Sequence, residues 1–116
     1  MQESKTVSYY EEADLGRFPD VARFRKELMD RFFAWYEDAT AEEGALNRRE
    51  KALIALALAH SERCPYCIDA WTEKCLEAGA DPDQMTEAVH VAASMQAGVT
   101  LVHAVQMHNR MDRSGV

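Results

Sequence analysis

The chain has 116 residues, a length typical of one domain that buries about two-thirds of its unfolded surface. Its formal net charge of -7 argues against binding to nucleic acid, which needs clustered Lys and Arg, and against anionic membrane surfaces. We find no unbroken apolar run of membrane-spanning length and no apolar signal-peptide core near the N-terminus, so we expect a cytoplasmic protein.

The N-terminal third combines a polar segment with one helical pattern. Residues 1–8 are polar and predicted to be flexible, and a short irregular entry follows them. From residue 20 to residue 39, apolar side chains recur at steps of three and four, which predicts an amphipathic helix. We interpret its aromatic stripe as core or subunit interface rather than a cofactor site. The stripe contains Phe24, Phe32 and Trp35.

A second helix is predicted from residue 47 to residue 60. Asn47 followed by Glu50 is typical of a capping box at a helix start. The segment that follows is rich in alanine and leucine and apolar all round. We therefore expect this helix to be buried on most sides.

Two more start signals predict the C-terminal helices. Pro65 fits the first position of a third helix, which we expect to end before Gly79. Asp81 is the predicted N-cap of a fourth helical stretch that runs to Met107, with Gly98 as a point where it divides.

The chain contains no sustained apolar–polar alternation and no hairpin signal, so the predicted fold class is all-α. We expect a single compact bundle of about five to six helices. The predicted organisation is a flexible N-terminus at 1–8, one domain at 9–110 and a C-terminal tail at 111–116.

Two cysteines, Cys64 and Cys67, stand three residues apart at the start of the third predicted helix. Free N–H groups and the positive end of the helix dipole lower the pKa of thiols there, and Arg63 adds a positive charge. Such a pair suits reversible dithiol–disulfide chemistry. The third cysteine, Cys75, makes the number odd, which argues against a structural disulfide framework.

Zinc binding and inert packing are the alternatives for this pair. Structural zinc needs four ligands, and the chain has no second C-x-x-C. His60 is a candidate third ligand, and His90 or His103 a candidate fourth, although their spacing would be unusual for a zinc site.

An Ala/Leu-rich helix, a C-x-x-C that opens the next helix, an LEAGA stop and an EAVHVAA helix occur in this order between residues 45 and 108. In these features the chain resembles the carboxymuconolactone decarboxylase and AhpD-like alkylhydroperoxidase family. The segments SYYEEADLGRF, FFAWY, EEGAL and CPYCIDAW are similar to a narrower branch, the arsenosugar biosynthesis-associated peroxidase-like proteins.

The resemblance implies an AhpD-like helical domain that assembles as a trimer or hexamer. It also implies antioxidant peroxidase or disulfide-reductase chemistry through the C-x-x-C pair, with no metal and no other cofactor. By motif position, Cys67 would be the peroxidatic thiol and Cys64 the resolving one, while Cys64 is the expected entry point for a reductant. The expected partners are a small peroxide or disulfide substrate and a protein or small-thiol reductant, but neither nucleic acid nor a membrane.

The chain departs from this family at two positions. Peroxidatic members place a His four residues after the second cysteine and a Glu twelve residues before the first, where this chain has Trp71 and Ala52. We predict that His60, which ends the helix just before the pair, replaces the missing base, with help from Glu50 or another His. Helix capping is the alternative role for both residues.

Two other functions are alternatives to the redox interpretation. The same cysteines would suit non-enzymatic binding of a soft metal or arsenic(III), because thiolates prefer soft ions. An oligomeric partner of an arsenic-related biosynthetic pathway is the other alternative. The cysteine pair itself argues against lactone decarboxylation, because decarboxylase members act without it.

Overall fold

The computed structural model describes residues 11–116, and in this part of the chain all regular structure is helical. The predicted all-α class is therefore confirmed, whereas the flexible segment predicted at 1–8 lies outside the described residues. A 3-10 helix, η1, precedes five α-helices. Their bounds are η1 Glu12–Arg23, α1 Lys26–Thr40, α2 Arg48–Ser61, α3 Pro65–Glu77, α4 Pro82–Val102 and α5 Ala104–Arg113.

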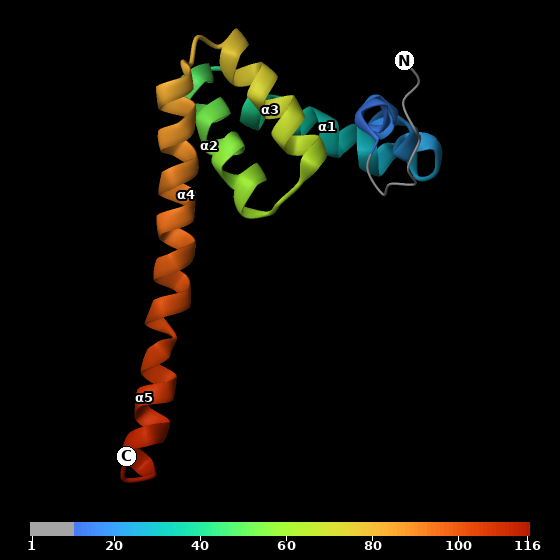
Figure 1. The fold of residues 1–116 in the computed structure, drawn as a ribbon. Helices are drawn as coiled ribbons and strands as arrows, with labels where there is room; N and C mark the ends of the chain where they lie inside the picture. The colour runs from blue at the N-terminus through green and yellow to red at the C-terminus, as the bar shows by residue number, and fades with distance from the viewer. Residues whose placement is uncertain (1–10) are drawn as a thin grey trace, which may run out of the picture.

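Helix α2 lies at the centre of the fold, with α3 on one side and α4 on the other (Figure 1). The chain reverses between α2 and α3 at the C-x-x-C turn, so these two helices run antiparallel. The α2 start is the predicted capping box, in which the side chains of Asn47 and Glu50 each accept a hydrogen bond from the other residue's backbone N–H.

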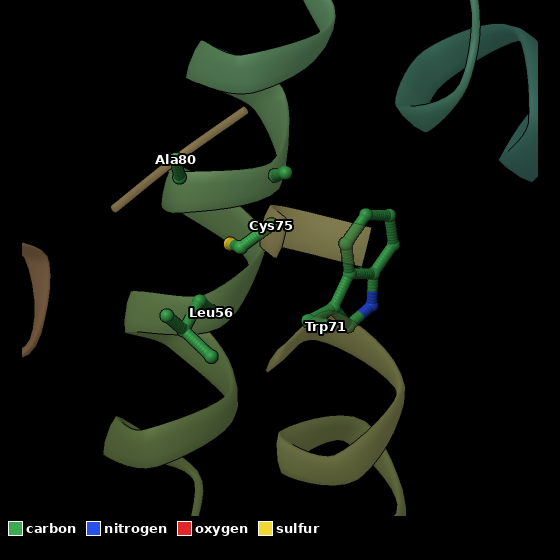
Figure 2. Packing of buried hydrophobic residues seen from close by; sticks show 5 residues of the cluster. Leu56, Trp71, Cys75 and Ala80 are labelled. Atoms are coloured by element: carbon green, nitrogen blue, oxygen red, sulfur yellow. The ribbon is translucent and has the colours of Figure 1, made fainter. Parts of the chain in front are cut away.

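The core is small and forms where α2 meets α3. Its buried cluster consists of Ala52, Leu56, Trp71, Cys75 and Ala80. Figure 2 shows Leu56 on α2 beside Cys75 and Trp71 on α3. Alanine and leucine side chains of α2 pack here against Trp71 and Cys75 of α3.

The opposite side of α2 is not buried in a single chain. Ile54 and Leu58 are 57% and 60% exposed, although the sequence predicted burial on most sides of this helix. An all-apolar helix with one exposed side needs further partners, because one small core covers only part of its circumference.

Helices α4 and α5 project from the body of the molecule (Figure 1). The radius of gyration is 19.6 Å, whereas a compact chain of this length has about 13 Å. The single chain is therefore more extended than the compact bundle that the sequence predicted. Three apolar side chains on this rod, Val91, Met95 and Val99, are each more than half exposed.

One predicted helix is divided in the structure. Arg25, at φ 56°, adopts the left-handed conformation and separates η1 from α1, so the pattern over 20–39 covers parts of two elements. A residue with positive φ cannot continue a right-handed helix. Apolar periodicity does not register such a local change of backbone direction.

The C-terminal boundary also differs from the predicted one. Helix α4 continues through Gly98, which costs about 1 kcal/mol relative to alanine in a helix, and the break comes at His103. Helix α5 then continues to Arg113, three residues into the predicted tail.

The α4–α5 stretch meets a composition criterion for a membrane-crossing helix. Pro82–Arg113 includes a window with a mean hydropathy of 1.3, and residues 88–105 contain no Asp, Glu, Lys or Arg. No such segment was predicted from the sequence because His, Ser, Gln and Thr interrupt the apolar run. Core helices of soluble proteins meet the same criterion but are mostly buried, whereas none of this window is buried in the single chain, although α4 packs against α2. The absence of a membrane partner stays a prediction.

Candidate functional site

The two cysteines of the C-x-x-C turn lie together at the start of α3. Cys64 is the N-cap and has an extended backbone, and Pro65 occupies the first helical turn, where no N–H is needed. The two Sγ atoms are 2.7 Å apart, and the Cys67 backbone N–H donates to the Cys64 Sγ at 3.3 Å. Both thiols are free and half-buried. The predicted dithiol geometry is therefore present.

The backbone turn before Cys64 is what aims the pair. Arg63 takes the left-handed conformation at φ 53°, and the Cys64 N–H donates to the Ala59 carbonyl at 3.0 Å. This closes the end of α2 and sets the first turn of α3 directly after it. The Arg63 side chain lines a different cavity from the thiols. The positive charge that the sequence predicted beside the thiols therefore does not face them.

An open cleft of about 660 Å³ lies beside the dithiol. One wall is η1, and the other is the first turn of α3. The lining residues are Asp14, Leu15, Arg17, Phe18, Asp20, Val21, Cys64, Tyr66 and Cys67. Small molecules therefore have a route to both thiols.

The pKa of the Cys67 thiol is raised above its ordinary value. Burial, a hydrogen bond with Cys64 and the charge of Cys64 together raise this pKa to about 11. The Cys64 Sγ accepts the Cys67 backbone N–H and lies in hydrogen-bond contact with the Cys67 Sγ. The raised pKa keeps the proton on Cys67 and therefore disfavours Cys67 as the first nucleophile.

Peroxidatic members of the family have a Glu and a His, their proton relay, at the positions of Ala52 and Trp71. In this chain both positions lie in the core. Ala52 is 2% exposed and Trp71 is 5% exposed, and both belong to the same buried cluster. The small side chain on α2 and the indole on α3 thus both belong to the packing between these helices. An apolar contact thus replaces a polar pair, and neither residue can accept a proton from a thiol.

Tyr36 of α1 is a site residue that the sequence did not single out. It packs against the same cluster, with its ring 6.3 Å from the Trp71 ring between centroids. Burial raises the pKa of its hydroxyl, a hydrogen bond with Trp71 lowers it, and the charges of Cys67 and Cys64 raise it. Its only sequence signal is membership of the aromatic segment in α1, which does not reveal which side chain approaches the thiols.

His60 faces a different cavity from the dithiol. Its Nδ1 lies 2.9 Å from the Leu56 carbonyl, so Nδ1–H donates there. The ring lines a cavity of about 780 Å³ between the end of α2 and α4. The structure therefore brings His60 close to the turn in sequence but does not place it in the cleft with the thiols.

Glu50 lies at the far end of α2. Ten residues separate it from His60, which is about 15 Å along an α-helix. Its carboxylate accepts the Asn47 N–H at 2.9 Å as part of the capping box. Helix capping accounts for this residue, and the structure does not bring it to the dithiol.

The remaining histidines do not complete a metal site with the pair. His90 is exposed, and the exposed His103 contacts the Val99 carbonyl through Nδ1 at 2.7 Å. Cys75, whose pKa is raised by burial, lies fully buried in the core. Within residues 11–116, no three His, Cys, Asp or Glu side chains cluster as metal ligands do. An arsenic(III) or soft-metal site would have only the two thiols of this turn in this part of the chain.

Comparison with known proteins places most of the chain in one family. The sequence model of the carboxymuconolactone decarboxylase family matches residues 26–108. An uncharacterised protein encoded in the cox locus of Paracoccus denitrificans is 39% identical over 85 residues, which cover 73% of this chain and 76% of that protein.

Two solved structures share the fold. A carboxymuconolactone decarboxylase family protein from Legionella pneumophila, in its apo form, has a TM-score of 0.59 and 31% identity, covering 80% of this chain and 89% of that one. A protein from Methanobacterium thermoautotrophicum has a TM-score of 0.58 and 32% identity, covering 80% of this chain and 96% of that one. The narrower arsenosugar-associated branch stays a prediction.

The raised pKa of Cys67 predicts which thiol is alkylated first. At pH 8, a thiol with a pKa of about 11 is ionised in about one molecule in a thousand. Limited reaction with iodoacetamide should therefore label Cys64 at least about tenfold faster than Cys67, measured by peptide mass spectrometry. Buried Cys75 serves as the internal slow control. Faster labelling of Cys67 would contradict the assignment.

The core contact predicts that restoring only one relay residue is costly. Trp71→His replaces a buried indole by a smaller polar ring, which should lower the free energy of unfolding by about 2–4 kcal/mol in urea titrations. Ala52→Glu should also destabilise, and the double variant should lose less than the sum because both positions belong to one buried cluster. Strict additivity would show that the two positions do not contact each other.

Proposed function

The chain belongs to the carboxymuconolactone decarboxylase family, and from that premise we propose that it is a cysteine-based oxidoreductase that acts through Cys64 and Cys67. Family membership fits either AhpD-like redox chemistry or decarboxylase-like chemistry. The observation that carries the choice is the free dithiol, with Sγ atoms 2.7 Å apart beside an open cleft. Lactone decarboxylation has no use for such a pair.

Peroxide reduction is one half of this proposal. A thiolate attacks the terminal oxygen of a hydroperoxide, which breaks the O–O bond and leaves a sulfenic acid and an alkoxide, and the alkoxide takes a proton from solvent to give the alcohol. The second thiol then condenses with the sulfenic acid, forming the Cys64–Cys67 disulfide and releasing water. A thiol or dithiol reductant, itself oxidised, restores the pair by two exchange steps.

Thiol–disulfide exchange is the half that the local chemistry favours more. O–O cleavage releases an alkoxide or hydroxide, whose conjugate acid is far weaker than a thiol, so the leaving oxygen needs a proton donor. Exchange releases a thiolate, and because the corresponding thiol has a pKa of about 8.5, the thiolate leaves without a proton donor. With Trp71 and Ala52 in the core and His60 in another cavity, exchange is less affected by the missing relay.

Cys64 is the attacking thiol in this scheme. The Cys64 Sγ accepts a hydrogen bond from the Cys67 backbone N–H, and the raised pKa of Cys67 keeps the proton on the Cys67 thiol. Cys67 resolves the mixed disulfide after losing that proton. The motif-based assignment of Cys67 as the peroxidatic thiol is the competing order. A reducing compartment such as the cytoplasm suits a pair that must be returned to the dithiol form.

The test is thiol loss from reduced protein in the presence of an organic hydroperoxide or a small disulfide. We expect two thiols per chain to disappear, with disulfide consumption faster than peroxide consumption. Cys64→Ser should abolish fast reaction, Cys67→Ser should trap a mixed disulfide on Cys64, and Cys75→Ala should behave as the wild type. Rates no higher than those of a free thiol with both oxidants would refute the proposal.

We also propose that the working form is a homo-oligomer, a trimer or hexamer. The accessible surface is 9565 Å², whereas a compact monomer of 13.1 kDa exposes about 6,400 Å². The excess of about 3,000 Å² is in the range that permanent subunit interfaces bury. It includes the apolar side chains of α4 and the outer side of α2, which need cover in water.

Light scattering after size-exclusion chromatography tests the assembly. We expect a mass of three or six chains for the wild type. Met95→Glu combined with Val99→Glu should shift the protein towards smaller species, because both side chains are more than half exposed on the projecting helix. Val116→Glu, at the end of the chain, is the matched control and should leave the mass unchanged. A monomeric wild type at micromolar concentration would contradict the proposal.

A further inference from the structure

One wall of the dithiol cleft lies outside the part of the chain that matches the family. The match begins at residue 26, whereas η1 ends at Arg23. Six of the nine lining residues belong to η1, between positions 14 and 21. The family core thus supplies the thiols, and a segment outside the family match supplies most of the surface that a substrate meets.

Aromatic contacts hold this segment against α1. The Phe18 ring lies 5.1 Å from the Phe33 ring and 6.1 Å from the Phe32 ring, between centroids. These separations fall in the range of favourable aromatic pairs. The wall is therefore a packed part of the fold, and its side chains keep a defined position relative to the thiols.

The wall combines an apolar surface with an excess of negative charge. Leu15, Phe18 and Val21 provide the apolar part. The Arg17 guanidinium pairs with the Asp20 carboxylate, with Nε 3.2 Å from Oδ2, so these two charges offset each other. Asp14 then leaves the η1 wall with a net negative charge.

The cation next to Cys64 in the sequence does not offset this charge. Arg63 precedes Cys64 in the sequence but lines the cavity on the α4 side. The chain as a whole carries a net charge of -7. An anion that approaches the Cys64 thiolate through this cleft is therefore repelled, whereas a cation is attracted.

We propose that η1 makes the dithiol selective for uncharged or cationic disulfides with an apolar part, and disfavours anionic ones. This inference rests on the proposed function and names its substrate class. In the reaction, the Cys64 thiolate attacks one sulfur of R–S–S–R, forming Cys64–S–S–R and releasing R–S⁻. Cys67 then loses its proton to solvent and attacks the Cys64 sulfur, which releases the second R–S⁻. The substrate gains the two electrons that the dithiol loses.

Three small disulfides of different charge test the selectivity. Cystamine is cationic, bis(2-hydroxyethyl) disulfide is neutral and glutathione disulfide is anionic. Second-order rate constants with reduced wild-type protein are each divided by the rate constant of 2-mercaptoethanol with the same disulfide. At low salt, we expect a cystamine-to-glutathione-disulfide ratio of about fivefold or more, which falls towards one in about 0.5 M salt.

Variants that replace carboxylates by uncharged amides test whether the selectivity comes from η1. Asp14→Asn combined with Asp20→Asn should lower the ratio at least about threefold and leave the rate with the neutral disulfide within about twofold. Glu87→Gln combined with Asp112→Asn changes the net charge by the same amount on α4 and α5 and serves as the control. The salt dependence of the wild type does not depend on any variant and is an independent readout.

The outcomes separate this inference from the proposed function. Fast reaction with all three disulfides but no dependence on charge overturns the selectivity and leaves the oxidoreductase proposal standing. An equal loss of selectivity in the control variant assigns it to the overall charge and also overturns a role for η1. Rates no higher than the reference thiol with every disulfide overturn both.

Discussion

The contact between α2 and α3 is the interaction on which the rest of the structure depends. Alanine and leucine side chains of α2 pack against Trp71 and the fully buried Cys75 of α3. Because the two helices are antiparallel and joined by one tight turn, this packing also places the dithiol at their common end. Stability and site geometry therefore come from the same few side chains.

The same contact limits the chemistry of the site. The indole occupies the position where the family's peroxidatic members carry a histidine, and Ala52 belongs to the same buried cluster. A packed apolar cluster stabilises the fold more simply than a buried polar pair, which must satisfy each of its hydrogen bonds. Within residues 11–116, no histidine lines the cleft beside the dithiol, and burial is the largest cause of the raised pKa of Cys67, followed by its contact with Cys64.

The single chain has two exposed apolar surfaces that its own core does not cover. The apolar side chains of α4 and the outer side of α2 are exposed, and the rod formed by α4 and α5 has no packing partner within residues 11–116 over its distal part. In contrast, η1 packs against α1 through aromatic rings and shapes the approach to the thiols. The proposed association and the proposed substrate choice thus involve elements on different sides of the α2–α3 core.

Much of the fold and part of the candidate site could be predicted because their causes are local. Asn47 and Asp81 mark helix starts through hydrogen bonds that span three residues, and Pro65 suits only a first turn. The adjacency of Cys64 and Cys67 follows from the same kind of short-range geometry. Gly98 was misleading because a glycine weakens a helix without ending it.

Only the tertiary structure decided which residues face the thiols. His60 is four residues from Cys64 in sequence, yet the left-handed turn at Arg63 separates its ring from the cleft. Tyr36 and η1 are far from the pair in sequence, yet packing brings them to it. The sequence by itself determined the helix starts and the dithiol, because backbone hydrogen bonding over one turn depends on neighbouring residues. The surroundings of the dithiol depend on how helices distant in sequence pack, and no pattern along the chain specifies that.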